Sequence, residues 1–181
     1  MKYCRIVRRT LNGKKRWFVQ LVVEGLPPVR KVYAPKCEVV GIDPGPSRIA
    51  YFHECQAAIV EVAPHVDLKE PKIRLLQRRI DRSRRANNPD NYNPDGTVKK
   101  GSSTWNTSNR GRRTAAKLAE HHRCLAATRK RDHGELVNDL LQIGGTIKIE
   151  KNNYRSFQRC FGRSTNRRGM GKFVEHLKRK A

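Results

Sequence analysis

"VVGIDPGPSRIAYF", residues 39–52, reads as two short apolar strands joined by a tight turn. The first run ends in a single carboxylate, Asp43, which is followed by Pro44-Gly45, a dipeptide that favours turns. The second run is apolar again, so the two segments predict antiparallel neighbours in a sheet. A lone acid at the end of a strand is unexpected in a chain as basic as this one.

The composition indicates a polyanionic partner. The 181 residues include 40 Lys and Arg against 16 Asp and Glu, which gives a net charge of +24 and a pI near 10.6. There is no run of 18 apolar residues and no secretory-type start, so we expect no membrane association and a cytoplasmic, nucleoid-associated protein. The five cysteines are widely spaced without a C-x-x-C motif, which favours reduced thiols over a zinc knuckle.

The charge is distributed unevenly along the chain. Residues 69–131 carry a net charge of +13, and the two ends of the chain are also basic. Residues 41–68 and 132–150 are each net negative, at −3. Acidity is therefore concentrated around Asp43 and Glu150.

The apolar pattern predicts a series of short strands at the start of the chain. We expect a β-hairpin over residues 3–24 with Asn12-Gly13 at its turn, and a linker carrying a short strand over residues 29–36. Three antiparallel strands are expected to follow, at residues 38–43, 48–53 and 56–63.

A helical period replaces this pattern further along. Residues 68–86 predict an amphipathic basic helix, and residues 87–109, rich in Asn, Asp, Pro, Gly and Ser, predict a long flexible loop. A second helix is expected from residue 110 to about 133 and onward past Gly134. Residues 146–150 alternate apolar and polar side chains as a strand does.

Three strands, a helical insertion and a fourth strand are the first part of a ribonuclease H-like α/β fold. In that plan the fourth strand lies parallel to the first, which would make Asp43 and Glu150 neighbours. Two adjacent carboxylates repel each other unless a cation lies between them. Mg²⁺ prefers such oxygen ligands and, as a pair of ions, catalyses phosphodiester hydrolysis. We therefore predict that Asp43 and Glu150 are metal-binding catalytic residues with Mg²⁺ as cofactor.

Several separated blocks resemble one family. "GIDPG" at 41–45 resembles the first nuclease motif of RuvC-type Holliday-junction resolvases. With it, the chain resembles TnpB, the OrfB product of bacterial insertion sequences and a relative of type V CRISPR effector nucleases. The other blocks are "LLQRRIDRSRRANNPDNYNPDGTVKKG", "GGTIKIEKNNYRSFQRCFGRS" and "FVEHLKRKA".

The resemblance implies an RNA-guided DNA endonuclease whose partners are a guide RNA and target DNA. It maps Asp43 and Glu150 onto the first and second catalytic carboxylates. It also implies that residues 1–36 are a remnant of a wedge β-barrel and that residues 37–181 are a partial RuvC-like nuclease domain, with 68–141 as a basic helical insertion.

The chain departs from the family pattern, and we expect truncation at both ends. The family has a longer N-terminal region and, after the second carboxylate, a four-cysteine zinc module and a third catalytic Asp. Here the acidic residue after Glu150 is Glu175, in a basic stretch, and "RRGMGKF" replaces the expected R-A-P-G-x-F pattern. We expect weak or no cleavage by this chain alone.

Ten basic residues of the two helices are predicted to contact nucleic acid. A density of this kind suits the phosphate backbone, although an ordinary solvated helix face is the alternative. The ten residues are Arg74, Arg78, Arg79, Arg82, Arg84, Arg85, Arg110, Arg112, Arg113 and Lys117.

Plainer alternatives stand beside the other predictions. Asp43 could merely hydrogen-bond its own turn, Glu150 could be an exposed strand end, and Trp105 could pack within its loop instead of stacking on a base. For function, the runner-up is a nuclease-inactive RNA- and DNA-binding protein of the same family. Actin-like ATPases, whose first strand also ends in Gly-Ile-Asp, are a third class, and the Arg-rich helices argue against them.

Overall fold

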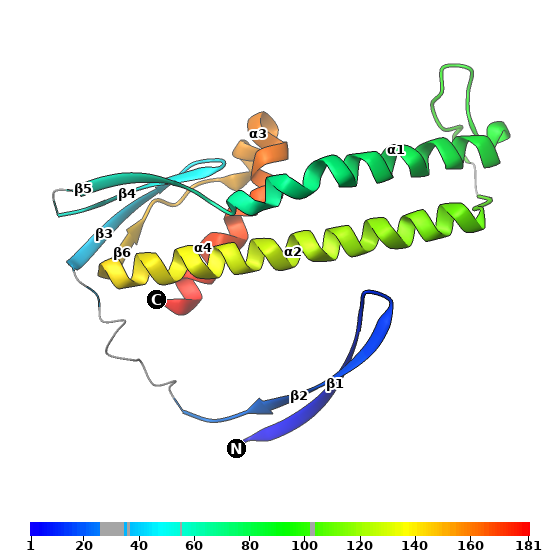
Figure 1. The fold of residues 1–181 in the computed structure, drawn as a ribbon. Coiled ribbons are helices and arrows are strands. Elements are labelled where there is room, and N and C mark those ends of the chain that lie inside the picture. The colour runs from blue at the N-terminus through cyan, green and yellow to red at the C-terminus, as the bar shows by residue number, and fades with distance from the viewer. Residues whose placement is uncertain (26–34, 36, 55, 102–103) are drawn as a thin grey trace.

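The computed structural model describes residues 1–25, 35, 37–54, 56–101 and 104–181 (Figure 1). Within these residues the protein is a mixed α/β structure with a two-stranded sheet, a four-stranded sheet and four α-helices. The α/β class predicted from the sequence is confirmed at this level. The predicted linker strand over residues 29–36 lies almost entirely outside the described residues.

The N-terminal hairpin forms as predicted. Strands β1 (Tyr3–Leu11) and β2 (Lys14–Val22) pair antiparallel, and their last pair joins Leu11 to Lys14. Asn12 and Gly13 between them have φ values of 52° and 73°. These are the residue types that adopt the left-handed backbone of a two-residue hairpin turn at low cost.

The four-stranded sheet has the order β5-β4-β3-β6. Its strands are β3 (Cys37–Pro44), β4 (Arg48–His53), β5 (Gln56–Glu61) and β6 (Gly144–Ile149). The pairs β3–β4 and β4–β5 are antiparallel, whereas β6 lies parallel to β3. The antiparallel meander and the parallel fourth strand are both as the sequence predicted.

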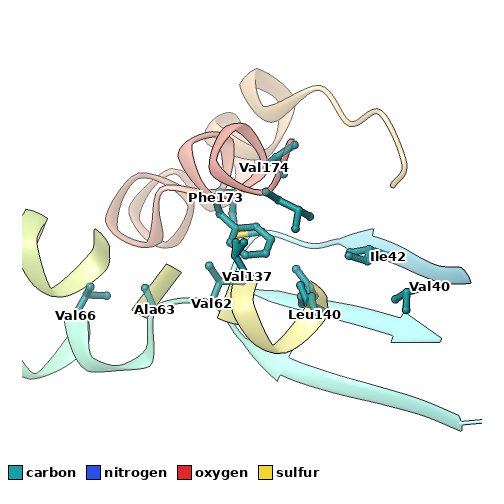
Figure 2. Packing of buried hydrophobic residues seen from close by; sticks show 12 residues of the cluster. Val40, Ile42, Val62, Ala63, Val66, Val137, Leu140, Phe173 and Val174 are labelled. Carbon is teal, nitrogen blue, oxygen red and sulfur yellow. The ribbon is translucent and has the colours of Figure 1, made fainter. Parts of the chain in front are cut away.

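Helices cover one face of this sheet. Val40, Ile42 and Ile49 belong to one buried cluster with residues of the C-terminal half of α2 (Asn109–Ile143) and of α4 (Met170–Lys180). Val40 and Ile42 are labelled in Figure 2. On the other face Val39, Phe52 and Ile59 are exposed. The rest of the core comes from the segment after β5 and from the two helices: Val62, Ala63, Val66, Val137, Leu140, Met170, Phe173, Val174 and Leu177.

A long helical hairpin extends from the sheet. The short 3₁₀-helix η2 (Pro64–Lys69) leads into α1 (Glu70–Asn87), which runs beside α2 (Figure 1). Ile73 and Leu76 of α1 are buried, as the helical period predicted. No helix among the described residues has the length and hydropathy that crossing a bilayer would require.

Small residues allow α1 and α2 to approach near the tip of this hairpin. A Cβ atom on Gly111 would lie 3.3 Å from Ser83 Oγ, so the two helices are in close contact at this point. Ser108 caps α2, because its hydroxyl accepts a hydrogen bond from the Gly111 amide at 3.1 Å. The close approach therefore depends on the absence of larger side chains.

In its described residues, which exclude 102–103, the connection between α1 and α2 contains internal contacts. Asn88 is buried and exchanges two hydrogen bonds with the backbone of Asn106, at 2.9 and 2.6 Å. Tyr92 forms an isolated bridge with Val98, and the Trp105 ring meets the Tyr92 ring edge-on. The composition of this connection is polar, and its Asn side chains form internal hydrogen bonds where an apolar segment would pack hydrophobic side chains.

Two helices follow β6 at the C-terminal end of the described chain. Helix α3 (Tyr154–Arg168) ends at Gly169, whose φ of 66° suits glycine, and α4 follows at once. Arg168 is buried and donates to the Val62 carbonyl at 2.9 Å and to Asp67 at 2.6 Å. These contacts hold the end of α3 against the segment that leads from the sheet to α1.

Candidate nucleic-acid interface and carboxylate pair

The two predicted catalytic carboxylates lie at the same end of the sheet. Asp43 is near the end of β3, and Glu150 directly follows the neighbouring strand β6. Ile42 pairs with Ile149 at the end of the β3–β6 ladder, and the Glu150 amide donates to the Ile42 carbonyl at 3.2 Å. The next positions are Asp43 and Glu150, which are therefore adjacent in the sheet. Both residues are exposed.

Strand alternation directs both acids to the open face. Ile42 is buried and Ile149 packs against the core, so these two side chains face the helices. Successive side chains of a strand point to opposite faces. Asp43 and Glu150 therefore share the face of the sheet that the described helices leave uncovered, where both are accessible to a large ligand.

Neighbouring backbone contacts shape the turn that follows Asp43. The Gly45 amide donates to the Arg48 carbonyl at 2.9 Å, which closes the turn between β3 and β4. Asn152 donates through its side-chain amide to the Pro44 carbonyl at 3.0 Å, which ties the segment after β6 to this turn. Beside Asp43 the open face has a shallow, largely apolar hollow of about 750 Å³.

The carboxylate pair is an incomplete metal site among the described residues. Within that part of the chain, Asp43 and Glu150 do not belong to any group of three or more acidic, His or Cys ligands whose atoms lie within 4.8 Å of one another. Two carboxylates suit Mg²⁺, which commonly keeps several waters and takes only one or two protein ligands. Such a pair could hold the ion with the help of phosphate oxygens.

A basic groove between α1 and α2 collects half of the predicted nucleic-acid contacts. Its volume is about 660 Å³, and no residue that lines it is acidic. Ser83, Asn87 and Thr114 add hydrogen-bonding groups to the lining. None of its cations takes part in an ion pair with the described residues. We define the basic groove by these five cations: Arg79, Arg82, Arg110, Arg113 and Lys117.

The other five predicted contacts lie outside the basic groove. Arg74 forms an ion pair with Glu70 one helical turn earlier. The Arg84 guanidinium lies 3.7 Å from the centre of the Trp105 ring, and Arg85 pairs with Asp81 at 3.1 Å. These three side chains are thus engaged within the protein, and Trp105 packs within its own loop. Arg78 and Arg112 are exposed outside the groove lining.

The structure has a second hollow with basic residues, which we did not predict from the sequence. It lies between α2 and α4 and has a volume of about 350 Å³. Its lining includes Arg129 and Lys130 of α2, and α4 contributes the acidic Glu175 and three basic residues. Those three basic residues are Lys172, His176 and Arg179. Their helical spacing in the sequence could have indicated that they share one face of a helix. Arg129 also donates to the backbone carbonyl of Asn166 at 3.1 Å, so it has a structural role as well.

Comparison with known proteins leaves the family of the chain open. No family model and no curated protein matches it. The resemblance to TnpB therefore stays a prediction from the sequence blocks. What the structure adds is geometric: one pair of adjacent acids on an open face, and one groove lined by five cations.

Proposed function

We propose that this chain is a nucleic-acid-binding protein of the TnpB type, with a partial ribonuclease H-like domain over residues 37–181 and a wedge-like hairpin over residues 1–36. It binds guide RNA and target DNA and contributes two Mg²⁺-binding carboxylates to phosphodiester hydrolysis. The observation that carries the proposal is the parallel pairing of β3 with β6, which puts Asp43 beside Glu150. Such a protein acts in the cytoplasm, at the nucleoid.

Asp43 and Glu150 have the chemistry that this role needs. Their oxygens are hard ligands, and both lie on an exposed face that a nucleic-acid strand can reach. When bound, Mg²⁺ polarises a phosphodiester and neutralises charge that develops during hydrolysis. The protein's own part is to hold the two carboxylates side by side: Asp43 lies in β3, and Glu150 directly follows β6 and is tied to β3 through its amide.

The basic groove supports the binding half of the proposal. Five cations without acidic neighbours in the lining produce a positive field, and Arg and Lys contacts to phosphates supply most of the sequence-independent affinity for nucleic acid. The groove is formed by two packed helices, so the backbone positions that carry the five cations are fixed relative to one another.

A cleavage assay with matched variants tests the catalytic half. The whole chain is incubated with guide RNA, Mg²⁺ and guide-matched DNA, and products are resolved on denaturing gels. Asp43→Asn is expected to abolish whatever cleavage occurs, because it removes a ligand charge with almost no change in shape. Asp139→Asn, an equal charge change at an exposed position of α2, is expected to leave it intact. Equal cleavage by wild type and Asp43→Asn would exclude the catalytic role.

The incomplete carboxylate set favours a second candidate, a nuclease-inactive binding protein. Among the described residues no third ligand joins Asp43 and Glu150, whereas the basic groove is complete without metal. In that case the same assay yields no products from wild type, while gel-shift binding of RNA and DNA persists in EDTA. Loss of binding in EDTA would argue against this candidate.

A further inference from the structure

Three metal-ligating side chains converge at the other end of β3, away from the carboxylate pair. Cys37 begins β3, His53 ends β4, and Glu54 follows in the turn to β5. One ligand atom from each lies within 4.8 Å of the other two. Cys37 Sγ is 3.4 Å from His53 Nδ1.

We propose that Cys37, His53 and Glu54 form a binding site for Zn²⁺. A thiolate, an imidazole and a carboxylate are the three donor types that zinc takes in proteins, and a thiolate is a poor ligand for Mg²⁺. In a tetrahedral site with Zn–S near 2.3 Å and Zn–N near 2.0 Å, sulfur and nitrogen are about 3.5 Å apart. The observed 3.4 Å agrees with that spacing.

The surroundings orient two of the three ligands. The Tyr51 ring stacks on the His53 ring, with centroids 6.1 Å apart and planes at 12°, which fixes the direction of the imidazole. Glu54 has a φ of 47°, a left-handed conformation that glycine or asparagine adopts more easily. Its carboxylate lies within 4.8 Å of the ligand atoms of Cys37 and His53.

The site would join β3 to β4 at a place where these two strands have no ladder pairs with each other. The β3–β4 pairing begins at Gly41 and Phe52, so the first four residues of β3 do not pair with β4. A zinc ion would join the start of β3 to the end of β4 there and leave a fourth coordination position for water. Cys37 and Asp43 are six residues apart on an extended strand, about 20 Å. The zinc site is therefore independent of the proposed Mg²⁺ site.

Zinc affinity of the full chain without an affinity tag provides the test. Competition with a chromophoric chelator should show one equivalent of tight binding, with Zn²⁺ preferred over Mg²⁺. Loss of an outer-shell partner commonly lowers metal affinity about 10–100-fold, so removing a direct ligand in Cys37→Ser or His53→Gln should lower it at least that much. The matched controls Cys160→Ser and His122→Gln, both at exposed positions, should bind as wild type does.

Cobalt substitution reports on the ligands without relying on a variant. Co²⁺ bound to wild type should show a thiolate-to-metal charge-transfer band together with the strong visible bands of a tetrahedral site. A spectrum without the thiolate band would overturn the proposal, even if Cys37→Ser failed to fold. So would retention of zinc by Cys37→Ser with its loss in Cys55→Ser, since the thiol ligand would then be a different one.

The Zn²⁺ proposal and the Mg²⁺ proposal can be tested independently of each other. Asp43→Asn should leave zinc affinity unchanged, whereas Cys37→Ser should leave Mg²⁺-dependent chemistry unchanged. Far-UV circular dichroism of each variant, compared with wild type, shows whether an affinity loss comes from the ligand or from unfolding. A loss of zinc binding in Asp43→Asn as large as in Cys37→Ser would contradict the assignment.

Discussion

Gly144 allows β6 to lie close beside β3. It follows the last turn of α2 and pairs with Cys37 in the parallel ladder. A Cβ atom there would lie 2.4 Å from Val40 Cγ2, and Val40 is fully buried. Its φ of −136° is ordinary extended backbone, so glycine is needed for space and not for conformation.

Gly144→Ala is therefore expected to destabilise the protein by about 1–3 kcal/mol, the usual range for overpacking a core. Urea denaturation followed by circular dichroism measures the free energy of unfolding. Gly162→Ala is the matched control, because a Cβ at that position meets nothing within 4 Å. Val40→Ala in the Gly144→Ala background should recover part of the loss. A Gly144→Ala protein as stable as wild type would contradict this argument, because it would show that Val40 or β6 can shift to make room for the methyl group without a loss of stability.

Among the elements, the α1–α2 hairpin decides which arginines are available to a ligand. The sequence did not distinguish among the ten basic residues predicted to contact nucleic acid, because helical spacing alone does not tell which faces of a helix pack against other parts of the protein. The folded connection uses Arg84 and Arg85 to pack on the rings of Trp105 and Tyr92. The five cations of the basic groove have no ring contact or ion pair of this kind with the described residues.

Substitutions in the basic groove should change the salt dependence of nucleic-acid binding. Each phosphate contact contributes about −0.9 to the slope of log affinity against log salt for duplex DNA and about −0.7 for single strands. Arg113→Ala should make the slope less steep by about that amount, whereas Arg84→Ala should change the slope little because Arg84 lies over Trp105. Fluorescence anisotropy at several salt concentrations measures both. Equal changes in the two variants would contradict the groove as the binding surface.

For the molecule as a whole, His133 links three helices at the centre of the core layer. It lies in α2, its Nε2–H donates to the Arg168 carbonyl at the end of α3 at 2.8 Å, and its ring meets Phe173 of α4 edge-on. Burial lowers the pKa of His133 below its ordinary 6.5, and the hydrogen bond to the Arg168 carbonyl opposes this shift. Nearby Arg129 and His176 lower the pKa further, while Asp132 raises it.

Folding stability should consequently fall as the pH drops below about 6.5. There the unfolded chain protonates its histidines, while folded His133 stays neutral until a lower pH, so the unfolded state binds more protons. The free energy of unfolding, measured in urea between about pH 8 and pH 5, should decrease toward acid. His133→Gln, which keeps an N–H donor, should reduce this dependence. A residual slope is expected from His176, whose pKa is also lowered, first by burial and then by Arg179. An unchanged slope would rule out His133 as its source.

Several features followed from the sequence because they depend on local chemistry. Asn12-Gly13 determined a hairpin turn, the apolar runs on either side of the Asp43 turn determined strands, and the helical recurrence of Ile73 and Leu76 determined the buried side of α1. The placement of Asp43 beside Glu150 also followed, because a helical crossover leaves few ways to return to a sheet. These predictions used short-range preferences and one general rule of chain topology.

The tertiary structure alone decided which side chains meet across long stretches of chain. Phe173 and Leu177 complete the core although their helix is strongly basic, since only its apolar side faces the sheet. In the described part of the loop before α2, Asn88 forms hydrogen bonds with the backbone of Asn106. Cys37 and His53 meet because the strands that carry them are neighbours. Contacts of this kind depend on the packing of whole elements, and a local pattern of residues holds no information about the partner that packing will supply.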